Sequence, residues 1–152
     1  MTTITQMQTT QIYQVFIGAT PEQVWDAITK PEFTSRYFYG SEIDSTFEPG
    51  APYVSWAPER EKVWVEGEVL ESDPPRRLAH TWHSLYNEES AGEPPSRVTW
   101  EIEPQDGGVT KLTVVHDRLE ASPKTAEGVA GGWSYVLSGL KTLLETGRPL
   151  GS

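Results

Sequence analysis

The chain has 152 residues, a length that suits a single domain with a sizeable core. It contains no cysteine, which excludes disulfide bonds, thiol catalysis and cysteine-based zinc sites, and its net charge of -10 disfavours contact with nucleic acid. No apolar run approaches the roughly 20 residues that span a bilayer, and the polar N-terminus does not resemble a signal peptide. We therefore expect a cytoplasmic protein that binds no nucleic acid, does not insert into membranes and carries no cofactor.

The first predicted elements are a strand and two short helices. Residues 11–18, "QIYQVFIG", are rich in β-branched and aromatic side chains, which favour a strand. Thr20, Pro21 and Gln23 then form a capping-box pattern, which predicts that a helix begins here. Pro31 ends that helix, because the residue before a proline avoids the helical region, and the stretch "PEFTSRYF" predicts a further short helical turn.

From residue 40 to about residue 117 the apolar side chains recur at every second position, which is the period of β-strands. Strands are predicted in "SEIDSTF", "PYVSWA", "KVWVEGEVLE", "RLAHTWHSLY", "RVTWEIE" and "TKLTVVHD", while "NEESAGEPPS" is typical of an exposed loop. In "RVTWEIE" the side chains of Val98, Trp100 and Ile102 share one face, and polar side chains share the other. One face of the sheet is therefore expected to be buried and the other solvated.

The buried face needs a cover, and only the C-terminal segment is long enough to supply it. Apolar residues recur there at steps of three and four, which predicts a long amphipathic helix with the stripe Val129, Trp133, Val136, Leu137, Leu140, Leu143 and Leu144. Strands and helices are segregated along the chain, so the predicted fold class is α+β. We assign residues 11–147 to one domain and expect residues 1–10 and 148–152 to be flexible tails.

Three stretches of the chain resemble a known family. They are "ATPEQVWDAITKPE" near the start, "GEVLESDPPRRLAHTW" in the middle and "GGWSYVLSGLKTLLE" at the end, and they occur in that family's order and spacing over about residues 11–146. The sequence thus resembles the homologues of the activator of the ninety-kilodalton heat-shock protein's ATPase, in the part that corresponds to that activator's C-terminal domain. This family lies within the superfamily of START and birch-pollen-allergen-like proteins, also called SRPBCC.

The resemblance implies a helix-grip fold, in which a curved antiparallel sheet of about six to seven strands wraps around a long C-terminal helix. Two short helices would follow the first strand, and a START-like ligand cavity would lie between the sheet and the long helix. Glycine inside a helix costs about 1 kcal/mol relative to alanine. We expect Gly131 and Gly132 near the cavity mouth and Gly139 where the helix crosses the strands; alternatively, the first two merely start the helix late.

Aromatic side chains are abundant, with six tryptophans in the chain. Rings that carry a polar atom can line a pocket and hydrogen-bond a guest, although the alternative is that most of them fill the core. Trp82 and Trp133 are the leading pocket candidates, because they lie in the stretches shared with the family. The full set of predicted ligand contacts is Tyr37, Phe47, Trp56, Val65, His80, Trp82, Trp100, Val114, His116, Trp133 and Leu137.

Two histidines, His80 and His116, are predicted on the buried face of the sheet, while His83 points outward. A histidine in a pocket can act as an acid or base near neutral pH, and Tyr37 would be a third candidate for that role. The alternative is a core histidine that holds a neighbouring hydroxyl or carbonyl group. No convincing second catalytic group accompanies either histidine, and two histidines do not make a metal site, so neither catalysis nor metal binding is the expected role.

The leading hypothesis is a soluble protein that binds a small hydrophobic or aromatic ligand between the sheet and the C-terminal helix. An enzyme of the cyclase, dehydratase or hydrolase kind, using a cavity histidine, is the first alternative, because the superfamily includes such catalysts. A chaperone-interacting stress protein is the second, by analogy with the activator that names the family. The expected partner is accordingly a small hydrophobic ligand, and alternatively a chaperone or a second copy of the chain as a homodimer.

Overall fold

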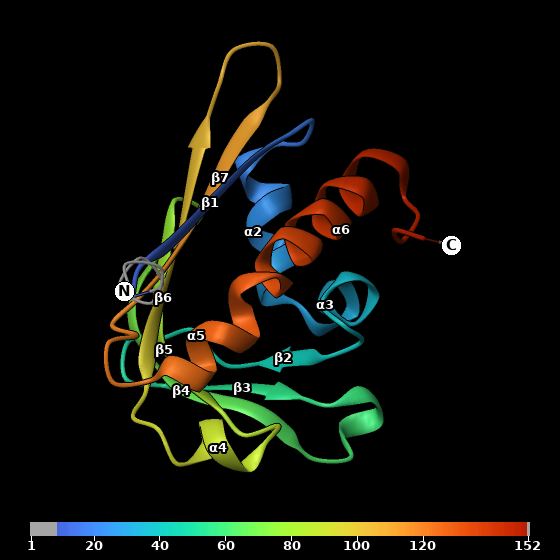
Figure 1. Ribbon diagram of the computed structural model, residues 1–152. Helices are drawn as coiled ribbons and strands as arrows, with labels where there is room; N and C mark the ends of the chain where they lie inside the picture. Colours follow the sequence, from blue (N-terminus) through green and yellow to red (C-terminus); the bar gives the residue numbers. More distant parts are fainter. Residues whose placement is uncertain (1–8, 152) are drawn as a thin grey trace.

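A seven-stranded sheet and two C-terminal helices dominate the computed structural model, which describes residues 9–151 (Figure 1). The strands lie in the order β1-β7-β6-β5-β4-β3-β2, and every neighbouring pair is antiparallel. The tail expected over residues 1–10 lies outside the described residues, apart from its last two. The elements in chain order are β1 (Gln11–Ile17), α2 (Pro21–Thr29), α3 (Pro31–Tyr37), β2 (Glu42–Asp44), β3 (Pro52–Trp56), η1 (Pro58–Arg60), β4 (Val63–Asp73), β5 (Arg77–Ser84), α4 (Glu88–Ala91), β6 (Ser96–Pro104), β7 (Thr110–Asp117), α5 (Pro123–Ala130) and α6 (Gly132–Thr146).

The two short helices after β1 begin and end where the sequence predicts. The Thr20 hydroxyl accepts a hydrogen bond from the Gln23 backbone N–H, and the Gln23 side chain accepts one from the Thr20 N–H, so the capping box is confirmed. Lys30, the residue before Pro31, is extended, and α3 begins at that proline. These helices lie against the same side of the sheet as α6 (Figure 1).

The sheet is bent, and irregularities in β4 contribute to the bend. Trp64 has no partner on β3, because Ser55 pairs with Val65 and Trp56 pairs with Val63. A second irregularity lies further along the pairing of β4 with β5. Such bulges bend a strand and increase its twist. The sheet consequently curves around α6, which crosses its concave side, and this is the expected helix-grip arrangement (Figure 1).

The C-terminal helix is bent rather than continuous. It is divided at Gly131 into α5 and α6, and α6 ends at Gly147, whose φ of 77° is a left-handed conformation that suits glycine. The predicted apolar stripe is confirmed, because all of its members are buried except Leu144, which is partly buried and packs against the core. The break changes the direction of the chain between Val129 and Trp133, so both ends of the stripe still face the concave side of the sheet.

Gly139 lies against another helix and not, as was predicted from the sequence, against the strands. A Cβ at this position would lie 3.3 Å from the Cβ of Tyr37 and 3.5 Å from its carbonyl oxygen. The absence of a side chain therefore allows α6 to approach α3. The expectation that Gly139 marks the crossing with the strands is wrong, because periodicity shows which face of a helix is apolar but not which neighbour it meets.

The segment expected to be a loop between β5 and β6 contains the single-turn helix α4. The Asn87 side chain caps it by accepting a hydrogen bond from the Ser90 backbone N–H. Of its residues only Ser90 is buried. Four residues are too few to show an apolar period, which explains why the sequence pattern did not indicate a helix here.

Two glycine-to-alanine substitutions should have opposite outcomes. At Gly67 a Cβ would overlap the carbonyl oxygen of Thr81 on β5, so Gly67→Ala should reduce the free energy of unfolding by about 3 kcal/mol. At Gly131 nothing lies within 4 Å of an added Cβ and φ is -87°, so Gly131→Ala should leave stability unchanged or raise it by about 0.5 kcal/mol. Urea unfolding of both variants measures the difference in stability. Equal stabilities would contradict the close approach of β4 to β5 at Gly67.

Candidate functional site

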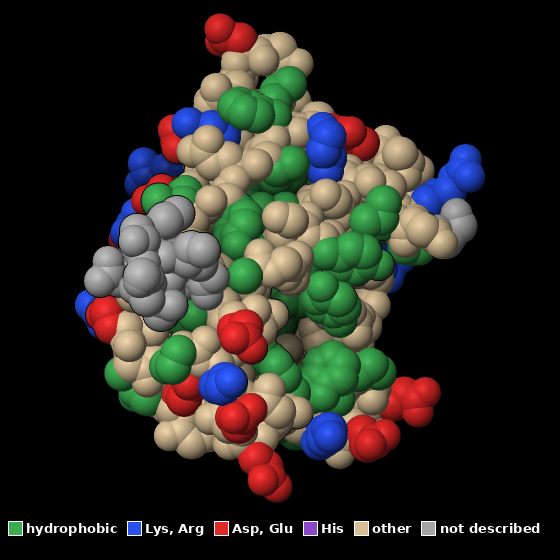
Figure 2. Space-filling view, in the orientation of Figure 1, with side chains coloured by type: hydrophobic (Ala, Val, Ile, Leu, Met, Phe, Trp, Pro, Cys, Tyr) green, Lys and Arg blue, Asp and Glu red, His purple; other side chains and the backbone are tan. Residues whose placement is uncertain are grey.

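A cavity of about 480 Å³ lies between the α5–α6 pair and the strands β3, β4 and β5. In the space-filling view the surface is hollowed among hydrophobic side chains near the junction of α5 and α6 (Figure 2). Cavities of this size accommodate small organic molecules. The thirteen lining residues are Phe38, Tyr39, Ser41, Ser55, Trp64, Val65, Trp82, Tyr86, Gly128, Val129, Gly132, Trp133 and Val136.

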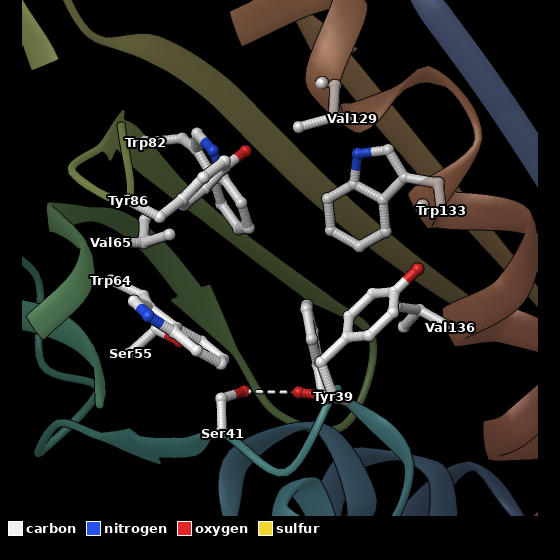
Figure 3. Close-up of a pocket in the computed structure, with 13 residues that line it drawn as sticks. Tyr39, Ser41, Ser55, Trp64, Val65, Trp82, Tyr86, Val129, Trp133 and Val136 are labelled. Carbon is white, nitrogen blue, oxygen red and sulfur yellow. Dashed lines mark hydrogen bonds between the residues drawn. The ribbon is translucent and has the colours of Figure 1, made fainter. Parts of the chain in front are cut away.

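The lining of the cavity is aromatic and carries no charged side chain. Six of its thirteen residues are Phe, Tyr or Trp, and none is Lys, Arg, Asp, Glu or His. The rings of Trp82 on β5 and Trp133 on α6 are tilted with centroids 5.5 Å apart, a geometry in which aromatic rings attract each other. Trp64 projects toward the cavity from the wall opposite Trp133 (Figure 3).

Two tyrosines stand at the mouth of the cavity, each beside a glycine of the helix pair. Tyr39 and Tyr86 are 53% and 40% exposed, and the Tyr39 ring stacks on Tyr135 with centroids 5.2 Å apart. A Cβ on Gly128 would lie 3.4 Å from the Tyr86 hydroxyl, and one on Gly132 would lie 3.7 Å from the Tyr39 hydroxyl. The bare backbone of these glycines therefore leaves the rings room beside the helices.

The sequence left two explanations open for Gly131 and Gly132: a position at the cavity mouth or a late start of the helix. Each glycine fits a different one. Gly132 lines the cavity, as expected for a residue at its mouth. Gly131 is exposed, has nothing within 4 Å of an added Cβ and separates α5 from α6. It therefore marks the start of the second helix and contributes nothing to the wall.

Hydroxyl groups are the main polar groups of the lining, and they differ in their partners. The Ser41 hydroxyl donates to the carbonyl oxygen of Phe38 at 2.6 Å (Figure 3). The Tyr86 hydroxyl accepts a weaker bond from Ser84 at 3.4 Å. Ser55 on β3 is only 4% exposed, and its hydroxyl makes no hydrogen bond with any of the residues that the structure describes.

His116 joins the C-terminal helix to the sheet. Its Nδ1 accepts a hydrogen bond from the indole N–H of Trp133 at 3.0 Å. Its Nε2 must then carry the proton, which it donates to the Ser96 hydroxyl at 2.7 Å. Ser96 in turn donates to the carbonyl oxygen of Trp82. This chain of three hydrogen bonds runs from α6 through β7 and β6 to β5, and it leaves no lone pair or proton of the imidazole free.

His80 also uses both ring nitrogens in hydrogen bonds, but in this residue Nε2 is the acceptor and Nδ1 is the donor. Its Nε2 accepts from the indole N–H of Trp100 at 3.0 Å, and its Nδ1 donates to the carbonyl oxygen of Thr81 at 2.9 Å. The Tyr53 ring stacks on the imidazole with centroids 3.7 Å apart. Both histidines are therefore neutral and occupy opposite tautomers, which their hydrogen-bond partners determine.

Burial lowers the pKa of both imidazoles, to about 4 for His80 and to about 3 for His116. A protonated imidazole would also carry an N–H on the nitrogen that accepts from the indole. Two hydrogen-bond donors would then face each other in each histidine–tryptophan pair. Neither histidine lines the cavity. The geometry thus favours the core-histidine interpretation over acid–base catalysis. Within residues 9–151, no three His, Asp or Glu side chains are grouped as metal ligands.

The structure brings some of the predicted ligand contacts together and separates others. Val65, Trp82 and Trp133 line the cavity. Tyr37 borders a smaller hollow of about 160 Å³, and its hydroxyl donates to the carbonyl oxygen of Ala27. The others lie outside the cavity lining: five are buried in the core, namely His80, Trp100, Val114, His116 and Leu137, and two are partly buried, namely Phe47 and Trp56.

Sequence reasoning missed most of the remaining lining for identifiable reasons. Tyr39 and Tyr86 lie on loops, where no period shows the direction of a side chain. Strict alternation placed Trp64 on the opposite face from Val65, but the bulge in β4 turns both toward the cavity. Val136 was predicted as part of the helix stripe, and only the position of the bend shows that it faces the cavity.

Comparison with solved structures supports the same fold. A protein from Mesorhizobium loti is 25% identical, with a TM-score of 0.74 over 90% of this chain and 96% of that one. An HSP90 activator from Plasmodium falciparum is 22% identical, with a TM-score of 0.71 over 93% and 98%. The Aha1 dimer from Colwellia psychrerythraea is 16% identical, with a TM-score of 0.71 over 91% and 98%. No curated protein matches the sequence.

The bent sheet, the gripped helix and the apolar cavity define a START-like protein of the helix-grip class. Residues 18–145 match the family described as Activator of Hsp90 ATPase homolog 1-like protein, so the chain belongs to this family. The resemblance seen in the three sequence stretches is thereby confirmed. No helix among residues 9–151 is both long and apolar enough to cross a bilayer.

The two buried histidines should make stability depend on pH. In the unfolded chain they protonate near pH 6.5, whereas in the folded protein they remain neutral to about pH 4 and pH 3. The unfolded state therefore binds more protons below pH 6.5, and the free energy of unfolding falls as the pH is lowered. We expect a loss of about 2 kcal/mol for each histidine between pH 7 and pH 5.

Urea unfolding at several pH values in this range measures the effect. The variant His116→Gln should be less stable than the wild type at pH 7 but should lose only about half as much stability between pH 7 and pH 5. A wild-type stability that stays constant over this range would show that the imidazoles are not held neutral.

Proposed function

We propose that this protein binds a small, mostly apolar molecule in the cavity between the α5–α6 pair and the sheet. The observation that carries the proposal is the apolar cavity of about 480 Å³, which lies at the concave side of the sheet and reaches the surface (Figure 2). Burial of apolar surface on binding would supply the driving force. Membership of the Activator of Hsp90 ATPase homolog 1-like family agrees with a ligand-binding role.

The aromatic rings that line the cavity are held by contacts with their neighbours. Trp133 and Trp82 are each held by a hydrogen bond from the indole N–H, to His116 and to Ser84 respectively. Phe38 packs edge-on against Trp133 with centroids 5.8 Å apart. The Trp133 bond joins α6 to β7 and the Trp82 bond lies within β5, so both of these indole rings that line the cavity have a fixed orientation.

The two alternatives have less support. An enzyme that uses a cavity histidine is disfavoured, because both His80 and His116 lie outside the lining and have both ring nitrogens engaged. A chaperone-interacting role rests on the family alone, since 22% identity to an HSP90 activator shows a shared fold. A cytoplasmic location, expected from the absence of cysteine, and self-association remain predictions.

Two adjacent glycines provide a test of the proposal. In Gly132→Leu the added side chain would occupy the mouth of the cavity beside Tyr39, so binding of a neutral apolar fluorophore such as N-phenyl-1-naphthylamine should weaken by about tenfold or more. In Gly131→Leu the side chain would project into open space, so binding should match the wild type.

Fluorescence titration of the three proteins gives the affinities, and urea unfolding confirms that both variants are folded. Equal binding by both variants would show that the probe lies outside this cavity. Failure of the folded wild-type protein to bind this probe or any other apolar molecule would overturn the proposal.

A further inference from the structure

The charge of the cavity restricts what it can hold. None of its thirteen lining residues is Lys, Arg, Asp, Glu or His. The buried histidines His80 and His116 are neutral and hydrogen-bonded to indole groups. A carboxylate, phosphate or ammonium group inside would therefore be buried without an opposite charge, which is strongly unfavourable. The enclosed part of a ligand must be uncharged.

The shape and chemistry of the walls favour flat rings. Trp64 and Trp133 point toward the cavity from opposite sides, and Trp82 and Tyr86 lie beside them at a third wall (Figure 3). Aromatic faces and edges interact more favourably with another ring, through stacked and edge-on contacts, than area alone accounts for. An aromatic guest would gain these contacts on more than one wall, whereas an alkyl chain would gain only the burial of its surface.

Ser55 supplies a polar contact within this apolar lining. Its side chain is 4% exposed, and its hydroxyl has no hydrogen-bond partner among the described residues. The Ser55 oxygen is not among the fully buried atoms that lack a partner, so it remains accessible from the cavity and can hydrogen-bond a guest. The other buried serine of the lining, Ser41, already donates to a backbone carbonyl. The unpartnered Tyr53 hydroxyl and Trp56 indole N–H do not line the cavity.

We infer that the enclosed part of the ligand is an uncharged, planar aromatic group that carries a hydroxyl or carbonyl oxygen, and that this oxygen hydrogen-bonds to the hydroxyl of Ser55. The inference rests on the proposed function, since it requires that the cavity holds a ligand. It adds the class of ligand and the residue that selects it. Ser55 would orient the guest by its oxygen while Trp64 and Trp133 contact its rings.

Four small probes separate the parts of this inference in the wild-type protein at pH 7. They are 2-naphthol, naphthalene, the 2-naphthoate anion and 1-decanol, and isothermal titration calorimetry measures their affinities. 2-Naphthol should bind about fivefold to tenfold more tightly than naphthalene, because it adds one hydrogen bond. 2-Naphthoate should bind more weakly than naphthalene because of its charge, and 1-decanol should bind more weakly than 2-naphthol because it has no ring.

Ser55→Ala tests the assigned residue directly. In this variant the affinity for 2-naphthol should fall to that for naphthalene, while the affinity for naphthalene should stay within about twofold of the wild type. Ser138→Ala, which removes an exposed hydroxyl from α6, should retain the full preference for 2-naphthol. Circular dichroism shows that both variants are folded.

The outcomes distinguish this inference from the proposed function. If the ring probes bind but Ser55→Ala keeps the preference for 2-naphthol, the role of Ser55 is wrong and the ligand-binding function stands. Tighter binding of 1-decanol or of 2-naphthoate would overturn the aromatic or the uncharged class respectively. If neither these probes nor N-phenyl-1-naphthylamine binds the folded wild-type protein, the proposed function fails and this inference fails with it.

Discussion

The hydrogen bond from the Trp133 indole to His116 is a buried link between the C-terminal helix and the sheet. It joins α6 to β7 at 3.0 Å, and Ser96 continues the connection to the backbone of β5. Because the indole N–H is held by the sheet, the Trp133 ring is fixed with one side toward the core and the other toward the cavity. This contact, together with the hydrogen bond of Tyr13 to Ala130 and the apolar packing of α6, sets the position of the helices above the sheet and the space between them.

Three local departures from regular structure turn that space into a cavity with a mouth. The bulge in β4 directs Trp64 inward, and the break at Gly131 bends the C-terminal helix over the strands. Gly128 and Gly132 then leave room for the two tyrosines at the rim. Each feature reduces regular hydrogen bonding or helix propensity, and each lies in or next to the lining of the same cavity.

Much of the fold could be predicted from the sequence, because it depends on periodicity and on local signals. The capping box of α2, the alternation in β6 and β7 and the apolar stripe of α6 all follow from repeating patterns along the chain. The site could be predicted only in part. Trp82 and Trp133 lie on regular elements, whereas Trp64 depends on a bulge and Tyr39 on a loop with a positive φ. The role of the histidines depended on their partners across the sheet, which no sequence pattern shows.

The most direct measurement is a long-range ¹H–¹⁵N NMR spectrum of the imidazole rings between pH 5 and pH 8. The two hydrogen-bond patterns require His116 to carry its proton on Nε2 and His80 to carry its proton on Nδ1, with both rings neutral throughout this range. Observation of these two opposite tautomers would support the connection between α6 and the sheet. A His116 ring that titrates near pH 6.5, or that carries its proton on Nδ1, would contradict the account.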